Sequence, residues 1–176
     1  VTSMKKQLSV LLFLLCVWSV VLAQHRKEFT IVQTSIPPKI DAVPTDTVWD
    51  AAYSIRDFIQ QSPTNGGVPS QHTEVRMLYD NEAIYVLAML YDTKPDSIYA
   101  EIGDRDSGDE ANADLFSVEI NPYNDGLNAT EFMVSAAGVQ MDSKNDLQTM
   151  NKSWDAVWKS EVKKTDIGWI VEMKIP

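Results

Sequence analysis

The sequence predicts an all-β protein, an antiparallel β-sandwich of jelly-roll type. Short segments at 73–80, 114–121 and 129–136 alternate between apolar and polar residues, as half-buried strands do. Residues 83–91 (AIYVLAMLY) are continuously apolar, which is typical of a central strand covered on both faces. Asn, Asp, Gly and Pro gather between these segments, and short strands at this spacing with little helix favour a sandwich.

Two short elements are expected before the first long strand. Residues 29–33 can form a strand. Residues 45–52 (TDTVWDAA) can form one helical turn that Thr45 or Asp46 would cap. In this turn the side chain of Trp49 would point inward.

Two hairpins and a connecting strand complete the expected sheets. Residues 73–80 and 83–91 predict the first hairpin, because turn-forming Asp and Asn residues separate them. A short strand is expected at 139–142, and residues 156–163 and 168–175 predict the last hairpin. The alternating segments between the two hairpins should direct the following side chains into the core: Phe116, Val118, Ile120, Phe132 and Val134.

Residues 1–23 have the pattern of an export signal. Two lysines follow Met4, an apolar run occupies 8–22, and small or β-branched residues precede a cleavage site before Gln24. The alternative is a retained membrane anchor, since the run approaches the lower length limit of a bilayer span. We expect the three residues before Met4 to lie upstream of the natural start.

Residues 24–36 are predicted to be a leader, and residues 37–176 a single domain. The chain stops at Pro176, directly after a predicted strand. A sandwich leaves its edge strands open unless they are paired or covered. We therefore expect this sandwich to be truncated at its C-terminus and the natural protein to continue.

Charge and cysteine content exclude several kinds of partner and site. Removal of the two signal lysines lowers the 15 basic residues to 13, against 25 acidic ones, and moves the net charge from −10 to −12. Nucleic acid and anionic lipid are therefore unsuitable partners, because both require basic patches. Cys16 is the only cysteine and lies in the export signal, so the exported chain has no disulfide or cysteine zinc site.

Several motifs occur in an order that resembles a known family. They are KID at 39–41, a strand, acidic turn and strand at 73–92, WDAVW at 154–158 and GWIVEMKIP at 168–176. Over residues 37–176 this order resembles family-9 carbohydrate-binding modules. It resembles in particular the version at the N-terminus of exported Gram-negative proteins that continue into a predicted outer-membrane β-barrel.

The resemblance implies a β-sandwich, carbohydrate binding, a role in glycan breakdown or uptake, and often a structural calcium ion. It also implies a location in the periplasm, in the outer membrane or at the cell surface. Sugar-binding members carry a Trp just before the strand that begins at Asp114, and Arg and Asn where this sequence has Met133 and Ser135. These differences keep open the alternative of a structural docking domain for the barrel, without sugar binding.

Trp154 and Trp158 are the first candidates for a saccharide site, because indole rings stack on the apolar faces of sugar rings. Their side chains would share a face, roughly 13 Å apart in a strand or about 5–6 Å apart in a helix. The alternative is that at least one packs in the core, as we expect for Trp49 and Trp169. The polar contacts expected for a bound oligosaccharide or polysaccharide are Arg105, Asn112 and Asn124.

An acidic loop after residue 103 is a candidate calcium site. Calcium prefers several hard oxygen ligands that converge from one loop. The spacing does not fit an EF-hand, and a solvated acidic loop is the alternative interpretation. The predicted ligands are Asp104, Asp106, Asp109 and Asp114. The ion would be structural, and no cofactor is required for function.

The sequence contains no catalytic motif. A Ser-His-Asp site built on His72 would lack a nucleophile-elbow sequence. Paired carboxylates could hydrolyse glycosides, but with 25 acidic residues some pair has a suitable spacing by chance. The sequence therefore predicts a non-catalytic carbohydrate-binding module. A docking domain is the main alternative, and a free-standing glycosidase is a third.

Overall fold

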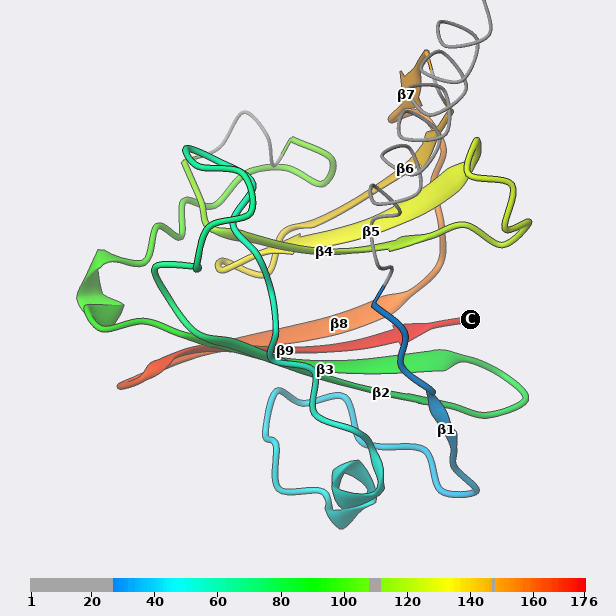
Figure 1. The fold of residues 1–176 in the computed structure, drawn as a ribbon, viewed down its shortest axis with the longest axis horizontal. Coiled ribbons are helices and arrows are strands. Elements are labelled where there is room, and N and C mark those ends of the chain that lie inside the picture. Colours follow the sequence, from blue (N-terminus) through cyan, green and yellow to red (C-terminus); the bar gives the residue numbers. More distant parts are fainter. Residues whose placement is uncertain (1–26, 108–111, 147) are drawn as a thin grey trace, which may run out of the picture.

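Two β-sheets face each other in the computed structural model, which describes residues 27–107, 112–146 and 148–176 (Figure 1). One sheet has the strand order β1-β2-β3-β9-β8, and the other has the order β4-β5-β6-β7. This arrangement confirms the predicted all-β sandwich. The elements are β1 (Val32–Gln33), η1 (Thr47–Ala51), β2 (Thr73–Tyr79), β3 (Ile84–Tyr91), η2 (Pro95–Ser97), β4 (Leu115–Ile120), β5 (Ala129–Ser135), β6 (Gln140–Asn145), β7 (Met150–Asn151), β8 (Lys159–Thr165) and β9 (Gly168–Ile175).

Both predicted hairpins form. β2 pairs antiparallel with β3, with Val75 opposite Ala88, and β8 pairs antiparallel with β9. β9 also pairs with β3, so the second hairpin joins the first in one sheet. The predicted first strand of the second hairpin began too early. Ala156 and Trp158 precede β8, and the backbone N–H of Ala156 and the indole N–H of Trp158 bond to Asp142 on the other sheet.

The predicted helical turn is confirmed as the 3-10 helix η1, with Trp49 buried. Asp46 occupies the N-cap position, but its carboxylate makes no capping hydrogen bond. Instead, Asp46 Oδ2 accepts the backbone N–H of Lys39 at 2.8 Å. The predicted side-chain cap is therefore wrong, because this carboxylate holds the preceding loop.

The main core lies between the two sheets. Inward-facing residues of β3 and β9, such as Val86 and Val171, meet Phe132 and Val134 of β5. Phe116, Val118 and Ile120 of β4 pack against the same core and remain partly exposed. The predicted alternation is therefore confirmed in both central segments, and apolar burial between the layers stabilises the sandwich.

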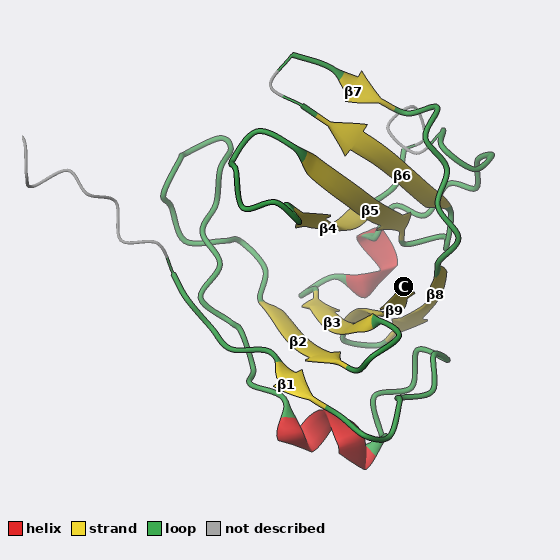
Figure 2. Ribbon diagram, turned by 90° about the vertical axis from the view of Figure 1, so that its right-hand side faces the viewer, coloured by secondary structure: helices red, strands yellow, loops and turns green. Residues whose placement is uncertain are grey.

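A second, smaller core lies on the other face of the five-stranded sheet. The segment that carries η1 covers this face, on the far side from β4–β7 (Figure 2). Trp49 packs there on Leu78, Tyr85 and Leu87. Since β3 is covered on both faces, its continuously apolar sequence is explained.

The predicted export signal and Asp109 lie outside the described residues. Where the chain is described, it contains no helix with the length and apolar character needed to cross a membrane.

Candidate functional site

A groove of about 890 Å³ opens at one end of the sandwich. The β2–β3 turn and the β4–β5 loop, which line it, lie on the right of Figure 1. The groove lies where the β2–β3 turn meets the loops that follow β4 and β6. From the five-stranded sheet it is lined by Tyr79, Asp80, Asn81, Glu82, Ile84 and Ile175. From the other sheet its polar and aromatic lining is Tyr123, Asn128, Thr130, Phe132, Lys144, Asn145, Asp146, Thr149, Asn151 and Trp154. Aromatic rings and short amides therefore line one continuous surface.

Trp154 lies in the extended segment that joins β7 to β8, and its ring borders the groove. It meets the ring of Phe132 edge to face, with centroids 6.2 Å apart and an interplanar angle of 73°. The ammonium of Lys144 lies 4.7 Å from the centroid of the same ring. Trp154 is thus fixed in orientation and already has contacts in the protein.

The acidic wall of the groove is preorganised. Asp80 accepts the backbone N–H groups of Glu82 and Ala83 at 2.8 and 2.9 Å and the hydroxyl of Tyr85 at 2.8 Å. These hydrogen bonds lower the pKa of Asp80, so it stays charged at neutral pH. Burial and the bond to Asp80 raise the pKa of Tyr85 to about 12, so its hydroxyl remains a donor.

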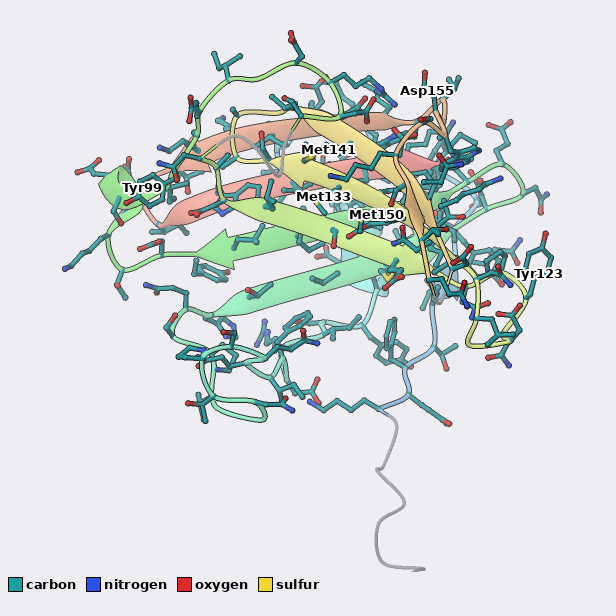
Figure 3. All side chains as sticks on the ribbon, turned by 90° about the horizontal axis from the view of Figure 1, so that it is seen from above. Tyr99, Tyr123, Met133, Met141, Met150 and Asp155 are labelled. Carbon is teal, nitrogen blue, oxygen red and sulfur yellow. The ribbon has the colours of Figure 1, made fainter. Side chains whose placement is uncertain are left out.

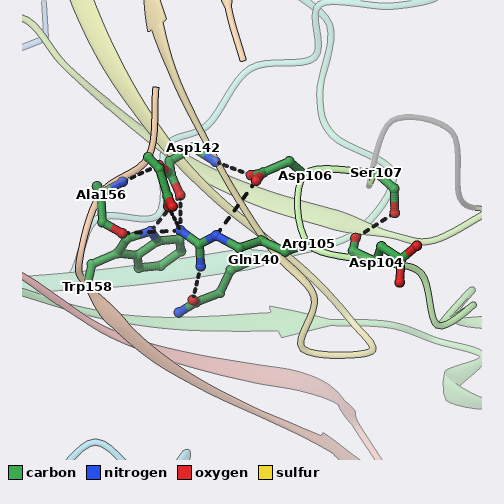
Figure 4. Close-up of polar contacts among 9 residues, drawn as sticks. Asp104, Arg105, Asp106, Ser107, Gln140, Asp142, Ala156 and Trp158 are labelled. Atoms are coloured by element: carbon green, nitrogen blue, oxygen red, sulfur yellow. Dashed lines mark hydrogen bonds and ion pairs between the residues drawn. The ribbon is translucent and has the colours of Figure 1, made fainter. Parts of the chain in front are cut away.

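Trp158 and Arg105, both predicted to contact a saccharide, belong instead to a bracing cluster (Figure 4). Trp158 is only 8% exposed, and its indole N–H bonds to Asp142 at 3.1 Å. The Arg105 guanidinium bonds to Asp142, to Asp155 at 2.9 Å and to Gln140 at 2.8 Å. Stacking on Trp158 is therefore blocked, as the alternative of a core tryptophan anticipated.

The other two predicted polar contacts lie in different places. Asn124 sits next to Tyr123 in the β4–β5 loop, in the left-handed backbone region at φ 49°. Asn112 lies in the segment before β4, where its N–H bonds to Glu101 Oε2 at 3.0 Å. Of the predicted saccharide residues, Trp154 lines the groove and Asn124 adjoins it.

The three described carboxylates of the predicted calcium site serve different contacts. Asp106 Oδ1 accepts the backbone N–H of Asp142 at 3.3 Å. Asp104 bonds through its carbonyl to Ser107, and burial raises the pKa of Asp114. No group of three metal-binding side chains occurs among the residues that the structure describes. Asp109 lies outside them, so the calcium site stays a prediction.

A second depression, of about 670 Å³, lies at the opposite end of the five-stranded sheet. His72 stacks there on Tyr91, with ring centroids 5.4 Å apart.

Sequence reasoning missed Tyr123 and the β2–β3 turn as parts of a site. An aromatic residue inside the turn-rich sequence PYNDGLN was the available signal, but turn formation already explained its neighbours.

Residues 40–176 match the family model described as carbohydrate family 9 binding domain-like. A family-9 carbohydrate-binding module from Caldicellulosiruptor kristjanssonii, in complex with cellotriose, superimposes with a TM-score of 0.58 at 16% identity, over 82% of this chain and 65% of that chain. Its complex with glucose gives a TM-score of 0.56, also at 16% identity, over 82% and 66%.

A candidate carbohydrate-binding protein from Bacteroides uniformis superimposes with a TM-score of 0.63 at 13% identity, over 83% of this chain and 71% of that chain. The present chain thus spans slightly less than two thirds of the Caldicellulosiruptor protein. At these identities the likeness concerns the fold. The comparison with curated proteins gives no match.

Proposed function

Because the chain belongs to the carbohydrate family 9 binding domain-like family, we propose that it binds a saccharide, without catalysing a reaction, in the groove at the end of the sandwich. The observation that carries the proposal is the lining of this groove. Aromatic rings bury the C–H faces of a sugar, and amides and carboxylates exchange hydrogen bonds with its hydroxyls. The groove volume lies within the usual range of ligand sites.

The first ligands to consider are glucose-based oligosaccharides. The structurally similar Caldicellulosiruptor module was crystallised with cellotriose and with glucose. Those complexes support a saccharide as the class of ligand. The present groove supplies its own contacts, such as Asn128, Asn145 and Asn151 along one wall.

Binding without catalysis fits the state of two acidic side chains in the groove, Asp146 and Asp80. Asp146 accepts the N–H groups of Gln148 and Thr149 at 2.8 and 2.7 Å, which lowers its pKa. Asp80 is held in the same way by the β2–β3 turn. Both carboxyl groups are therefore ionised at neutral pH and cannot donate a proton. The acid residue of a glycosidase, by contrast, needs a raised pKa.

The cellular setting forms part of the same proposal. Export, a role in glycan breakdown or uptake, and attachment to a C-terminal outer-membrane barrel rest on the apolar run at 8–22 and on the family resemblance. A structural calcium ion in the loop from Asp104 to Asp114 is the optional cofactor of this proposal.

Titration of the chain with soluble oligosaccharides, followed by the indole N–H signals in ¹⁵N–¹H NMR spectra, tests the proposal. The panel should include cellotriose, xylotriose and mannotriose. We expect the Trp154 signal to shift, while Trp158, which bonds to Asp142 in the core, serves as internal control. No shift at millimolar saccharide would overturn the proposal and favour the docking role.

A further inference from the structure

The groove contains several aromatic side chains, and one of them is placed to receive a sugar ring. We propose that Tyr123 is the residue on which the saccharide stacks and that Asp125 positions Tyr123. This inference rests on the proposed function, because it assigns roles within the same groove.

The contacts of the aromatic rings distinguish Tyr123 from Trp154. Trp154 is already engaged by Phe132 and by the ammonium of Lys144. Tyr123 is 76% exposed and borders the groove from the β4–β5 loop. Figure 3 shows it projecting from the edge of the molecule, far from Tyr99, which is also exposed. A sugar can therefore reach the ring of Tyr123 without displacing a protein contact.

An exposed aromatic ring binds better when its backbone is already ordered, because less conformational entropy is lost on binding. The loop that carries Tyr123 meets this condition. Asn121 Oδ1 accepts the N–H of Tyr123 at 3.2 Å, and Asn121 Nδ2 donates to Asp125 Oδ1 at 3.1 Å. Asn121 and Asp125, which precede and follow Tyr123 in the sequence, thus hold the backbone of this loop in place.

Asp125 is the centre of this loop. Its Oδ1 also accepts the N–H groups of Leu127 and Asn128 at 2.8 and 3.0 Å, and its Oδ2 accepts the amide of Asn128 at 2.8 Å. These bonds lower the pKa of Asp125 strongly, so it remains ionised well into the acid range. Asp125 acts on the ligand through the loop that carries Tyr123, since it is not itself part of the groove lining.

The ligand class follows from the neighbours of Tyr123. A tyrosine face buries the C–H face of a pyranose, and the adjoining amide of Asn128 can bond to a hydroxyl at the rim of that sugar. Tyrosine on an ordered loop supplies this contact at a low cost in side-chain entropy. The structure assigns this position to a sugar ring of an oligosaccharide, with Trp154 lining another part of the same groove.

The test compares two exposed tyrosines by isothermal titration with the oligosaccharide that the wild-type chain binds. We expect Tyr123→Ala to weaken binding at least about tenfold and Tyr123→Phe to retain it, because the ring and not the hydroxyl makes the contact. Tyr99→Ala is the matched control, since Tyr99 is 59% exposed and lies outside the groove. It should change affinity by less than about twofold.

Equal affinity of wild type and Tyr123→Ala would overturn the stacking role while saccharide binding itself stands. A wild-type chain that binds no saccharide would instead reject the proposed function, and this inference with it. A Tyr123→Phe variant as weak as Tyr123→Ala would also contradict stacking, because it would assign the effect to the hydroxyl.

A double-mutant cycle tests the positioning role of Asp125. Asp125→Asn keeps one acceptor oxygen but cannot accept the Asn128 amide at the second position, so the loop loses order. We expect it to weaken binding about threefold in the wild-type background and to have no further effect in Tyr123→Ala. An equal loss in both backgrounds would show that Asp125 acts independently of Tyr123 and would overturn the positioning role.

Discussion

Two buried carboxylates, one on each sheet, hold a tryptophan in the same way but in different electrostatic surroundings. Glu172 of β9 accepts the indole N–H of Trp49 at 3.1 Å, and Asp142 of β6 accepts that of Trp158 at 3.1 Å. Each carboxylate also accepts at least one backbone N–H from the same covering segment. Each thereby fastens a segment without strand structure to its sheet.

The two carboxylates differ in their positive partner. Asp142 is paired with Arg105, whose guanidinium also bonds to the exposed Asp155. Among the described residues, Glu172 forms no ion pair and is bonded directly by N–H donors alone, while the Lys39 ammonium interacts with it at longer range. A directly bonded cation is therefore not needed to bury a carboxylate here. At Asp142, the cation Arg105 joins its own loop to β6 and to the segment before β8 through charge-assisted hydrogen bonds.

The largest effect should come from removing the charge that Arg105 requires. Asp142→Asn leaves the guanidinium and two N–H donors around a neutral amide. Loss of one partner of a fully buried ion pair costs roughly 3–5 kcal/mol. Because the Arg105 side chain is 38% exposed, we expect about 2–4 kcal/mol of lost unfolding free energy. Urea denaturation followed by tryptophan fluorescence measures this loss.

Asp155→Asn is the matched control for this prediction. Asp155 bonds to the same guanidinium nitrogen at 2.9 Å, but its side chain is 73% exposed. Exposed pairs contribute about 0–1 kcal/mol, so the control should remain near wild-type stability. Equal losses for the two variants would show that the burial of Asp142 does not matter.

The sequence predicted the strands well but gave no prediction for these two carboxylates, for a physical reason. Alternation reports which face of a strand is apolar, and it placed Phe132 and Val134 correctly in the core. A carboxylate in such a pattern is expected to face solvent. Glu172 accepts the backbone N–H of Asp41, which lies 131 residues away, and no local pattern contains that contact.

The candidate site shows the same limit. Trp154 was predicted from its residue type and lines the groove, whereas Trp158 in the same motif is a core residue. Both rings contact Phe132, so the motif placed them on one side of the chain as expected. Which of the two remains open to a ligand depends on Asp142, and that contact is set by the packing of the two sheets.

Glu172→Gln should have the second-largest effect. The substitution keeps the size of the side chain but turns one acceptor oxygen into an amide donor that faces an N–H group. A buried donor without an acceptor costs about 1–3 kcal/mol, and we expect a loss of unfolding free energy in this range. The matched control is Glu161→Gln, because Glu161 is the half-exposed partner of Glu172 on β8. It should stay within about 0.5 kcal/mol of wild type in urea denaturation.

A smaller effect is expected from Arg105→Lys. This variant distinguishes a stabilising role of Arg105 from a role in saccharide binding. Lysine keeps the charge but cannot bond to Asp142, Asp155 and Gln140 at once, as the guanidinium does. We expect a loss of about 1 kcal/mol in unfolding free energy and unchanged saccharide affinity. Weaker binding in a calorimetric titration at wild-type stability would restore Arg105 to the saccharide site.

The smallest expected effect is a change with pH in the contribution of Glu172 to stability. Burial raises the pKa of Glu172 above its ordinary value of 4.5, against the opposing hydrogen bonds. Between 4.5 and the raised pKa, the folded state therefore binds more protons than the unfolded state, so this group's contribution to stability falls as pH rises. Glu172→Gln lacks this contribution, while all other carboxylates are shared with wild type and cancel in the difference.

The stability difference between wild type and Glu172→Gln should therefore be largest at or below pH 4.5 and shrink toward neutral pH. Urea denaturation of both proteins at several pH values from 4 to 7 measures it. A difference that grows with pH would mean that the three N–H donors outweigh burial and that Glu172 favours its charged form. In that case N–H donors would stabilise an anion in the protein interior without the directly bonded cation that Asp142 has in Arg105.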